Sequence, residues 1–186
     1  MNSKIVVGLL IVLLITGYFV SFNHFENCEA SVLPKFYVDD DYDSSTPGWQ
    51  VDHFDCITDA INASSAGDRI IVYEGTYNER LTVPWKLDIF GENRDTTIID
   101  GGSTGDVIVV NAQHVNISHF TIKNSGSSSN NSIILINASY TTITDNKLIS
   151  GENGITVNYS HYNIIYDNII NSNSGNGIYL NHSNNN

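Results

Sequence analysis

The chain has 186 residues, a formal net charge of −12 at pH 7 and 41% hydrophobic residues, which suits one domain preceded by a leader. Its acidity argues against a nucleic-acid partner and against an anionic membrane surface, because both would repel it.

The first 30 residues resemble an export segment. Lys4 precedes an uncharged apolar run over residues 5–22, which is longer than a usual signal core and shorter than a full membrane span. Cleavage after Ala30 would release the protein, whereas an uncleaved segment would anchor it in a membrane through residues 5–22. In both cases we expect residues 31–186 to be exported, to the periplasm, the cell surface or the extracellular medium.

The chain contains two cysteines, Cys28 and Cys56. Cleavage after Ala30 would remove the first of them, so no disulfide framework is expected. We interpret Cys56 as a small buried hydrophobic residue on a helix.

Residues 31–68 are predicted to hold a strand, an acidic turn and a helix. The strand is Phe36–Val38, and Asp39, Asp41 and Asp43 follow it at alternate positions. Carboxylates at this spacing can ligate Ca²⁺, although the following residues do not complete an EF-hand loop. The alternative is a solvated acidic turn.

The helix is predicted over Asp52–Ala66, with its first residue as the N-cap, and it ends before Gly67. Phe54, Ile57 and Ile61 line one face. We expect this helix to cover the open end of the structure that follows, because a solenoid exposes the core of its first turn.

Short apolar runs separated by turn residues begin at residue 69. Alternation at period two indicates strands with one buried face. Strands are expected at Arg69–Tyr73, Leu81–Val83, Leu87–Phe90 and Thr97–Ile99, with turns at 74–76 and 91–93 and a loop at Gly101–Gly105.

A repeated unit occupies Ile133–Leu180, with a period of about 22 residues that is typical of solenoids. Superposing its copies aligns Ile133 with Ile155 and Ile178, Leu135 with Val157 and Leu180, Ile143 with Ile165, and Leu148 with Ile170. A degenerate earlier copy, Val107, Val109, Ile117, Phe120 and Ile122, matches Ile133, Leu135, Ile143, Asn146 and Leu148 at an offset of 26. The extra length is expected in a loop at Gly126–Asn131.

Three short strands per turn, stacked on the strands of the next turn, predict an all-β fold, a parallel β-helix over residues 69–186 with rungs about 4.8 Å apart. The last copy lacks its second and third strands, so we expect the solenoid to be truncated at its C-terminal end.

Two polar columns run through the repeat. Asn146 aligns with Asn168, and inward asparagine side chains at a bend can bond to neighbouring turns as a structural ladder. Asp145 aligns with Asp167, and His119 joins them by the offset of the earlier copy. Two carboxylates one rung apart would raise one pKa or bind a cation, or each aspartate would only cap its bend.

Six N-x-S/T sequons are present, at Asn62, Asn116, Asn130, Asn137, Asn158 and Asn181. In an exported chain these are candidate N-glycosylation sites. The alternative is that an Asn- and Ser-rich repeat generates such triplets without their being used.

Several stretches together resemble one family: Phe54–Ile61, Gly67–Tyr77, Leu87–Glu92, Thr97–Gly102, and Tyr37–Asp41 with Thr46–Trp49. They are similar to right-handed parallel β-helix proteins of the pectin-lyase-like superfamily, and most similar to its NosD-like branch. The resemblance covers about residues 36–186 and is specific for the fold. It implies a right-handed solenoid, and it brings a copper-binding label with it.

Three functions are compatible with this resemblance. Copper accessory proteins favour His, Cys and Met clusters, but the single methionine is Met1 and the six histidines show no paired spacing. Polysaccharide lyases and hydrolases of the superfamily use clustered carboxylates with a basic residue and often Ca²⁺. Asp145 and Asp167 are the best such pair, but only Lys123 and Lys147 are basic in the repeat.

The third function is a non-catalytic extracellular module that binds a carbohydrate or a cell-surface component. A solenoid offers a long ridged face for such contacts, and tyrosines that can stack on sugars are expected to point outward: Tyr140, Tyr159, Tyr162, Tyr166 and Tyr179. We favour this function because it requires no catalytic motif beyond what the chain contains.

Overall fold

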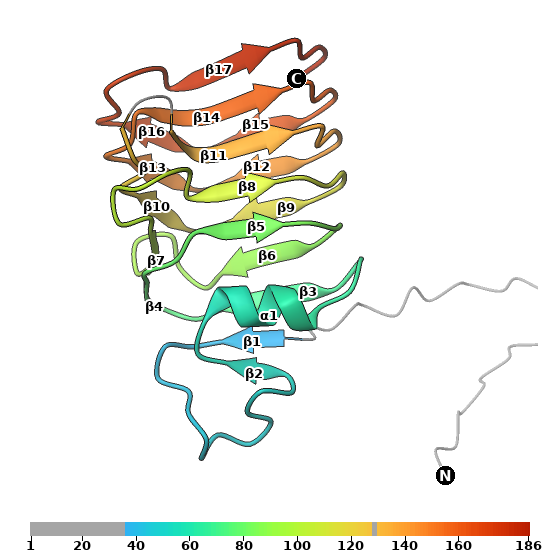
Figure 1. The fold of residues 1–186 in the computed structure, drawn as a ribbon, viewed down its shortest axis with the longest axis vertical. Helices are drawn as coiled ribbons and strands as arrows, with labels where there is room; N and C mark the ends of the chain where they lie inside the picture. The colour runs from blue at the N-terminus through green and yellow to red at the C-terminus, as the bar shows by residue number, and fades with distance from the viewer. Residues whose placement is uncertain (1–35, 128–129) are drawn as a thin grey trace, which may run out of the picture. The chain divides into compact units, whose positions relative to one another are not determined.

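The computed structural model describes residues 36–127 and 130–186. The predicted leader, residues 1–30, lies outside the described residues. The described chain is a parallel β-helix built from three sheets whose strands stack turn upon turn, as Figure 1 shows. No helix within the described ranges is long and apolar enough to cross a bilayer.

Each full turn contributes one strand to each of three sheets, named A, B and C, and the strands pair in parallel throughout. Sheet A contains β2 (His53–Phe54), β1 (Phe36–Val38), β3 (Arg69–Val72), β6 (Asp88–Gly91), β9 (Asn116–Ser118), β12 (Thr142–Thr144) and β15 (Ile164–Tyr166). Sheet B contains β4 (Gly75–Tyr77), β7 (Thr97–Asp100), β10 (Thr121–Lys123), β13 (Lys147–Ile149) and β16 (Ile169–Asn171). Sheet C contains β5 (Leu81–Val83), β8 (Ile108–Val110), β11 (Asn131–Ile136), β14 (Asn153–Asn158) and β17 (Ile178–Asn181).

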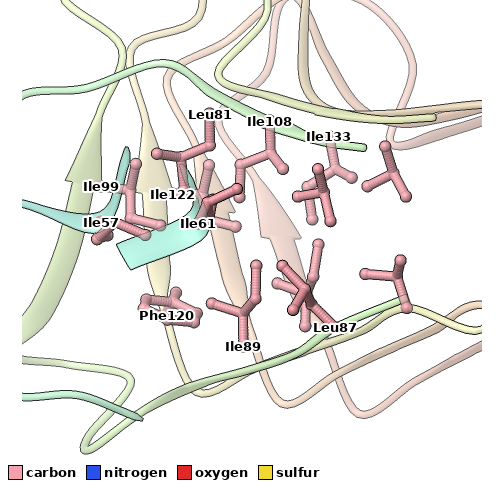
Figure 2. Close-up of a cluster of buried hydrophobic side chains, with 14 of the residues drawn as sticks. Ile57, Ile61, Leu81, Leu87, Ile89, Ile99, Ile108, Phe120, Ile122 and Ile133 are labelled. Atoms are coloured by element: carbon pink, nitrogen blue, oxygen red, sulfur yellow. The ribbon is translucent and has the colours of Figure 1, made fainter. Parts of the chain in front are cut away.

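Period-two alternation places one side chain in two inside the solenoid. In β3, Ile70 and Val72 are fully buried and their neighbours are partly exposed. Across the rungs these inward side chains form continuous rows. Leu81, Ile108 and Ile133 are paired in register in sheet C, and Figure 2 shows them in one row along the upper side of the buried cluster.

The register confirms the predicted superposition. Ile133 pairs with Ile155, which pairs with Ile178, and the equivalent rows hold in sheets A and B. The prediction was wrong for Val107 and Val109, because Ile108 is the residue that pairs with Ile133. Sheet C therefore has an offset of 25 at this turn, where sheet A has the predicted 26.

The physical cause is a corner shortened by one residue. Val110 and Asn116 are six positions apart, whereas their partners Leu135 and Thr142 are seven apart. A shift of one residue exchanges the two faces of a strand, so Val110 points inward and Val109 is partly exposed.

The helix is shorter than predicted and its cap is different. Helix α1 runs from Ile57 to Ala63, with Cys56 at the N-cap in extended conformation and without a side-chain capping bond. Phe54 lies in β2 instead, because its carbonyl accepts the Asp39 N–H at 3.0 Å and holds the chain extended. Asp52 therefore lies before a strand rather than at the helix start.

The predicted role of the helix is confirmed by its packing. Ile57, Ala60 and Ile61 are buried, and α1 contacts β1, β2, β3 and β5 at the N-terminal end of the solenoid (Figure 1). The predicted turn at 74–76 was wrong in part, because Gly75–Tyr77 forms β4, which pairs with β7.

The last described turn leaves its inward side chains uncovered. Ile178 and Leu180 are 47% and 48% exposed, whereas their partners Ile155 and Val157 in the preceding turn are fully buried.

Candidate functional sites

The corners of the solenoid are held by polar ladders. Asn146, which is fully buried, donates from Nδ2 to the carbonyls of Ile117 at 3.0 Å and Thr144 at 2.9 Å. Asn168 makes the equivalent bonds one turn later and accepts the Asn146 N–H at 3.0 Å. In the preceding turn the buried Phe120 takes this position, and its N–H donates to Asn146 Oδ1 at 3.1 Å.

Further ladders exist that the sequence analysis did not identify. Asn163 accepts the Thr141 N–H at 2.8 Å and is itself bonded to Asn186. Ser160 accepts the Ala138 N–H at 2.9 Å and donates to the Asn158 carbonyl. The sequence does contain a signal for this ladder, because Asn163 and Asn186 have the same spacing as Ile155 and Ile178, which pair in sheet C.

The column of Asp145, Asp167 and His119 lies at a corner where all three residues have positive φ, of 53°, 56° and 66°. Asparagine and aspartate tolerate this left-handed conformation better than most residues. The two aspartates have different surroundings, and a cation site between them stays a prediction. Asp167 is exposed, whereas Asp145 bridges His119 Nε2 at 3.1 Å and Arg94.

Arg94 was missed because it lies outside the repeat. Arg94 lies in the loop between β6 and β7, 51 positions before Asp145, and its Nη1 donates to Asp145 Oδ1. Both oxygens of this carboxylate are therefore engaged by cationic or ring nitrogens, and His119 Nδ1 is buried without a hydrogen-bond partner. The three side chains keep 27–38% of their surface exposed, so the cluster links residues of three turns at one corner and is partly open to solvent.

A groove on the outer face of sheet C has a volume of about 330 Å³. Its residues come from the last three turns: Asn131, Ile134, Glu152, Asn153, Thr156, Gly175, Asn176 and Tyr179. The groove is polar along one side, where three asparagines follow one another at successive rungs, and it contains an exposed tyrosine ring on the other.

Hydrogen bonds fix the orientation of the groove amides. Asn153 Oδ1 accepts the Asn176 backbone N–H at 2.9 Å and its side-chain amide at 3.3 Å. Asn131 Nδ2 donates to Asp106 Oδ1 at 2.7 Å, and the Thr156 hydroxyl donates to Asn131 Oδ1. The polar groups are thus arranged before any ligand arrives.

The outward tyrosines divide into two kinds. His114, Tyr140 and Tyr162 stack on one another with centroids 5.1 and 5.2 Å apart, and Tyr159 stacks on His182 at 4.8 Å. Both faces of Tyr140 are therefore covered by neighbouring rings. Tyr166 and Tyr179 lie on outward strand positions of sheets A and C and are 51% and 47% exposed.

The acidic turn does not gather its carboxylates. Asp39 Oδ1 accepts the Asp41 N–H at 3.0 Å, and Asp43 Oδ1 accepts the Ser45 hydroxyl at 2.6 Å and N–H at 2.8 Å. These bonds from Ser45 lower the pKa of Asp43. The carboxylates of Asp39 and Asp43 are bonded within their own loop, and a calcium site at this turn stays a prediction.

Among the described residues, one group of three metal-ligating side chains comes within range of a common ion: Asp55, Cys56 and Asp59. Burial raises the pKa of the Cys56 thiol to about 11. Cys56 is also only partly buried, contrary to the prediction of a buried residue.

The histidines in the described ranges are engaged separately. His53 Nδ1 bonds to Asp52 at 2.7 Å, His161 Nδ1 accepts the Asn184 N–H at 3.0 Å, and His119 bonds to Asp145. His114 and His182 lie in the aromatic stacks. His24 lies outside the described residues.

The sequons differ in accessibility. Asn62 and Asn137 are exposed. The side-chain amides of Asn116, Asn130 and Asn181 donate to Asp88, Ser127 and Asn158. The serines that complete the Asn158 and Asn181 sequons, Ser160 and Ser183, belong to a corner ladder. The repeat therefore has a structural reason to regenerate this triplet.

Comparison with known proteins supports this fold. The model of a family described as "Periplasmic copper-binding protein (NosD)" matches residues 61–186. No match was found among the curated proteins.

Similar solved structures include a pectin methylesterase mutant in complex with hexasaccharide IV, with a TM-score of 0.51 and 20% identity over 70% of this chain and 49% of that one. Pectin methylesterase PemA from Erwinia chrysanthemi has a TM-score of 0.51 and 18% identity over 70% of this chain and 49% of its own. A pectin methylesterase in complex with hexasaccharide VII has the same score and 18% identity, over 72% and 54% of the two chains.

This chain thus spans about half the length of those structures, and at this identity the likeness concerns the fold. The family match covers most of the chain, including every full turn from β3 onward. We conclude that the protein belongs to the NosD family of parallel β-helix proteins.

Proposed function

We propose that this protein is an exported, non-catalytic module that binds a carbohydrate chain in the groove on the outer face of sheet C. The observation that carries the proposal is the lining of that groove. Fixed amides and a hydroxyl suit the hydroxyl groups of a sugar, and the exposed ring of Tyr179 suits its apolar face.

The repeat itself favours a polymeric ligand. Asn131, Asn153 and Asn176 occupy the same place in three successive turns, about 4.8 Å apart. Asn131 is buried and forms the floor, and the other two are more exposed. A chain laid along the solenoid axis would meet the amides of Asn153 and Asn176 on adjacent rungs, and because hydrogen bonds already orient them, little ordering cost remains.

The lining favours binding over cleavage. Glycoside hydrolysis commonly requires two carboxyl groups about 5–10 Å apart, and Glu152 is the one carboxylate among the described residues that line the groove. The solved pectin methylesterases that bind hexasaccharides share the fold, which supports a saccharide as the ligand class.

The described residues do not fit a copper centre. Copper favours clustered His, Cys and Met ligands. The described histidines are bonded or stacked at separate places, and the one three-residue group among the described residues contains two aspartates and a single cysteine. We therefore assign no step to copper.

Isothermal titration with oligosaccharides that bind on a glycan array tests the proposal. We expect Tyr179→Ala and Asn153→Ala each to weaken binding about tenfold, which corresponds to about 1.4 kcal/mol. The matched control is Tyr166→Ala, because this ring is equally exposed in the same turn but lies on sheet A. Release of shorter oligosaccharides, or equal effects of both tyrosine variants, would contradict it.

A further inference from the structure

A second hollow lies on the outer face of sheet A, away from the groove in sheet C. Its volume is about 200 Å³, and it is lined by Arg69, Asp88, Ile89, Phe90, Asn116 and Ser118. Three adjacent strands, β3, β6 and β9, supply these residues, so the hollow rests on the rigid middle of a sheet rather than on loops.

One side of the hollow is a fixed polar row. Arg69, Asp88 and Asn116 are paired in register across the three strands. Asp88 Oδ2 accepts from Arg69 Nη2 at 3.3 Å, and Oδ1 accepts from Asn116 Nδ2. The carboxylate is thus oriented from both sides, and the row offers a guanidinium, a carboxylate and an amide within one surface.

The other side is an aromatic ring. Phe90 lies two positions after Asp88 and points outward, with 36% of its surface exposed. Its ring contacts the His119 ring at a centroid distance of 4.4 Å, and His119 is held in turn by Asp145. Gly91 permits the close approach of the two backbones, because a Cβ there would lie 2.3 Å from the His119 carbonyl oxygen.

The charged side chains around the Phe90 ring are paired with opposite charges. Arg69 is paired with Asp88, and Arg94 is paired with Asp145. An anionic ligand would gain one guanidinium but would also approach the Asp88 carboxylate. The volume is below the roughly 300–1,000 Å³ of pockets for drug-sized ligands, which limits the occupant to about one ring.

We propose that this hollow is a second saccharide subsite, which takes one neutral pyranose unit. The apolar face of the sugar packs on Phe90, and its hydroxyl groups bond to Asp88, Asn116 and Arg69. The choice of a saccharide among neutral polyhydroxyl ligands rests on the proposed function. With sites on two different sheets, one molecule can bridge two glycan chains and gain avidity.

The test is a titration of the full chain, made in a host without N-glycosylation, with mannohexaose, cellohexaose and hexagalacturonate. Unglycosylated protein is required because a glycan on Asn116 would fill the hollow. We expect two equivalents of a neutral hexasaccharide to bind. Phe90→Ala should reduce this to one and weaken the lost site at least tenfold, and Asp88→Asn should act in the same direction.

The control variant is Ile164→Ala, which removes an exposed apolar side chain from the same sheet in the same row as Asn116, and thermal unfolding checks that each variant is folded. One equivalent that depends on Tyr179 alone overturns the second subsite and leaves the proposed function standing. One equivalent that depends on Phe90 alone overturns the groove of the proposed function and leaves the site at Phe90 standing. Preference for hexagalacturonate at the Phe90 site overturns the neutral class, and no binding of any probe overturns both proposals.

Discussion

Single residues at the corners determine whether this chain can turn at all. A corner of a few residues requires left-handed backbone, and here the requirement is met more often by residues such as His119, Asp145 and Asp167 than by glycine. The same corners leave buried backbone groups without strand partners, and asparagine side chains satisfy them. Many of the polar side chains that the sequence suggests as functional are therefore used to satisfy the backbone groups at the corners.

Replacing Asn146 with leucine tests the ladder at its most buried position. The change leaves the carbonyls of Ile117 and Thr144 and the N–H of Phe120 without their partner. Each unsatisfied buried group costs about 1–3 kcal/mol, so we expect a loss of about 3 kcal/mol in the free energy of unfolding, measured with urea.

The matched control is Asn171→Leu, because Asn171 is exposed and substitutions at such positions usually change stability by less than about 0.5 kcal/mol. Equal effects of the two variants would show that the ladder is dispensable.

Asp100 provides a pH-dependent contribution to stability. Burial acts to raise its pKa, but hydrogen bonds from Gly102, Asn124 and Lys123 outweigh burial and lower it below the ordinary value. A lowered folded-state pKa stabilises above the unfolded value of about 3.9, and this stabilisation is lost as the pH falls through the folded value.

We therefore expect wild type to exceed Asp100→Asn in unfolding free energy at pH 7. The difference should shrink once the pH falls below about 4. Urea unfolding of both proteins between pH 7 and pH 2 checks this. A difference that stayed constant over that range would contradict it.

At the scale of elements, α1 begins where a distant side chain satisfies it. The Glu79 carboxylate accepts the N–H groups of Ile57 and Thr58 at 2.8 and 2.9 Å, so the loop after β4 provides the cap that Cys56 does not. A carboxylate at this end also interacts favourably with the helix dipole. Hydrogen bonds to Glu79 thus hold the helix that closes the N-terminal core against the first turn of the solenoid.

Glu79→Ala should destabilise the start of α1, because it removes the hydrogen bonds to the N–H groups of Ile57 and Thr58. Loss of a capping side chain costs about 0.5–2 kcal/mol, and we expect about 1 kcal/mol in unfolding free energy, together with faster amide exchange at Ile57 and Thr58. Glu74→Ala, at an exposed glutamate of the same region, is the control. Unchanged exchange in the Glu79 variant would contradict the capping role.

At the scale of the whole molecule, stability is distributed along a stack in which each turn packs on its neighbours. One inward row in sheet C contains Val83, Val110, Leu135, Val157 and Leu180. It passes from fully buried in the middle to 48% exposed at the last turn. The same residue type in the same row thus has two environments.

Leu135→Ala and Leu180→Ala compare those environments directly. A buried leucine replaced by alanine costs about 2–5 kcal/mol because it loses transfer energy and leaves a cavity. We expect Leu135→Ala to fall in that range and Leu180→Ala to cost less than about 1 kcal/mol, since half of that side chain is already in solvent. Similar losses in urea unfolding would show that the last turn is covered in solution.

The sequence by itself determined the architecture. Period-two alternation and a recurring unit fix strands, faces and rungs, because each turn repeats the same local choice. The rows from Ile133 to Ile178 and from Ile143 to Ile165 were predictable for that reason. The cap helix was predictable in kind, but its start was not, since Glu79 selects it from 22 positions away.

Only the tertiary structure decided the sites. The corner that shifts Val110 inward differs by one residue from its neighbours, and no local pattern shows which turn is shorter. Arg94 reaches Asp145 across 51 positions, Phe90 contacts His119, and Tyr140 stacks with His114 and Tyr162. These contacts join residues that are one or two turns apart, and such pairings depend on how many residues each intervening loop contains rather than on the residues themselves.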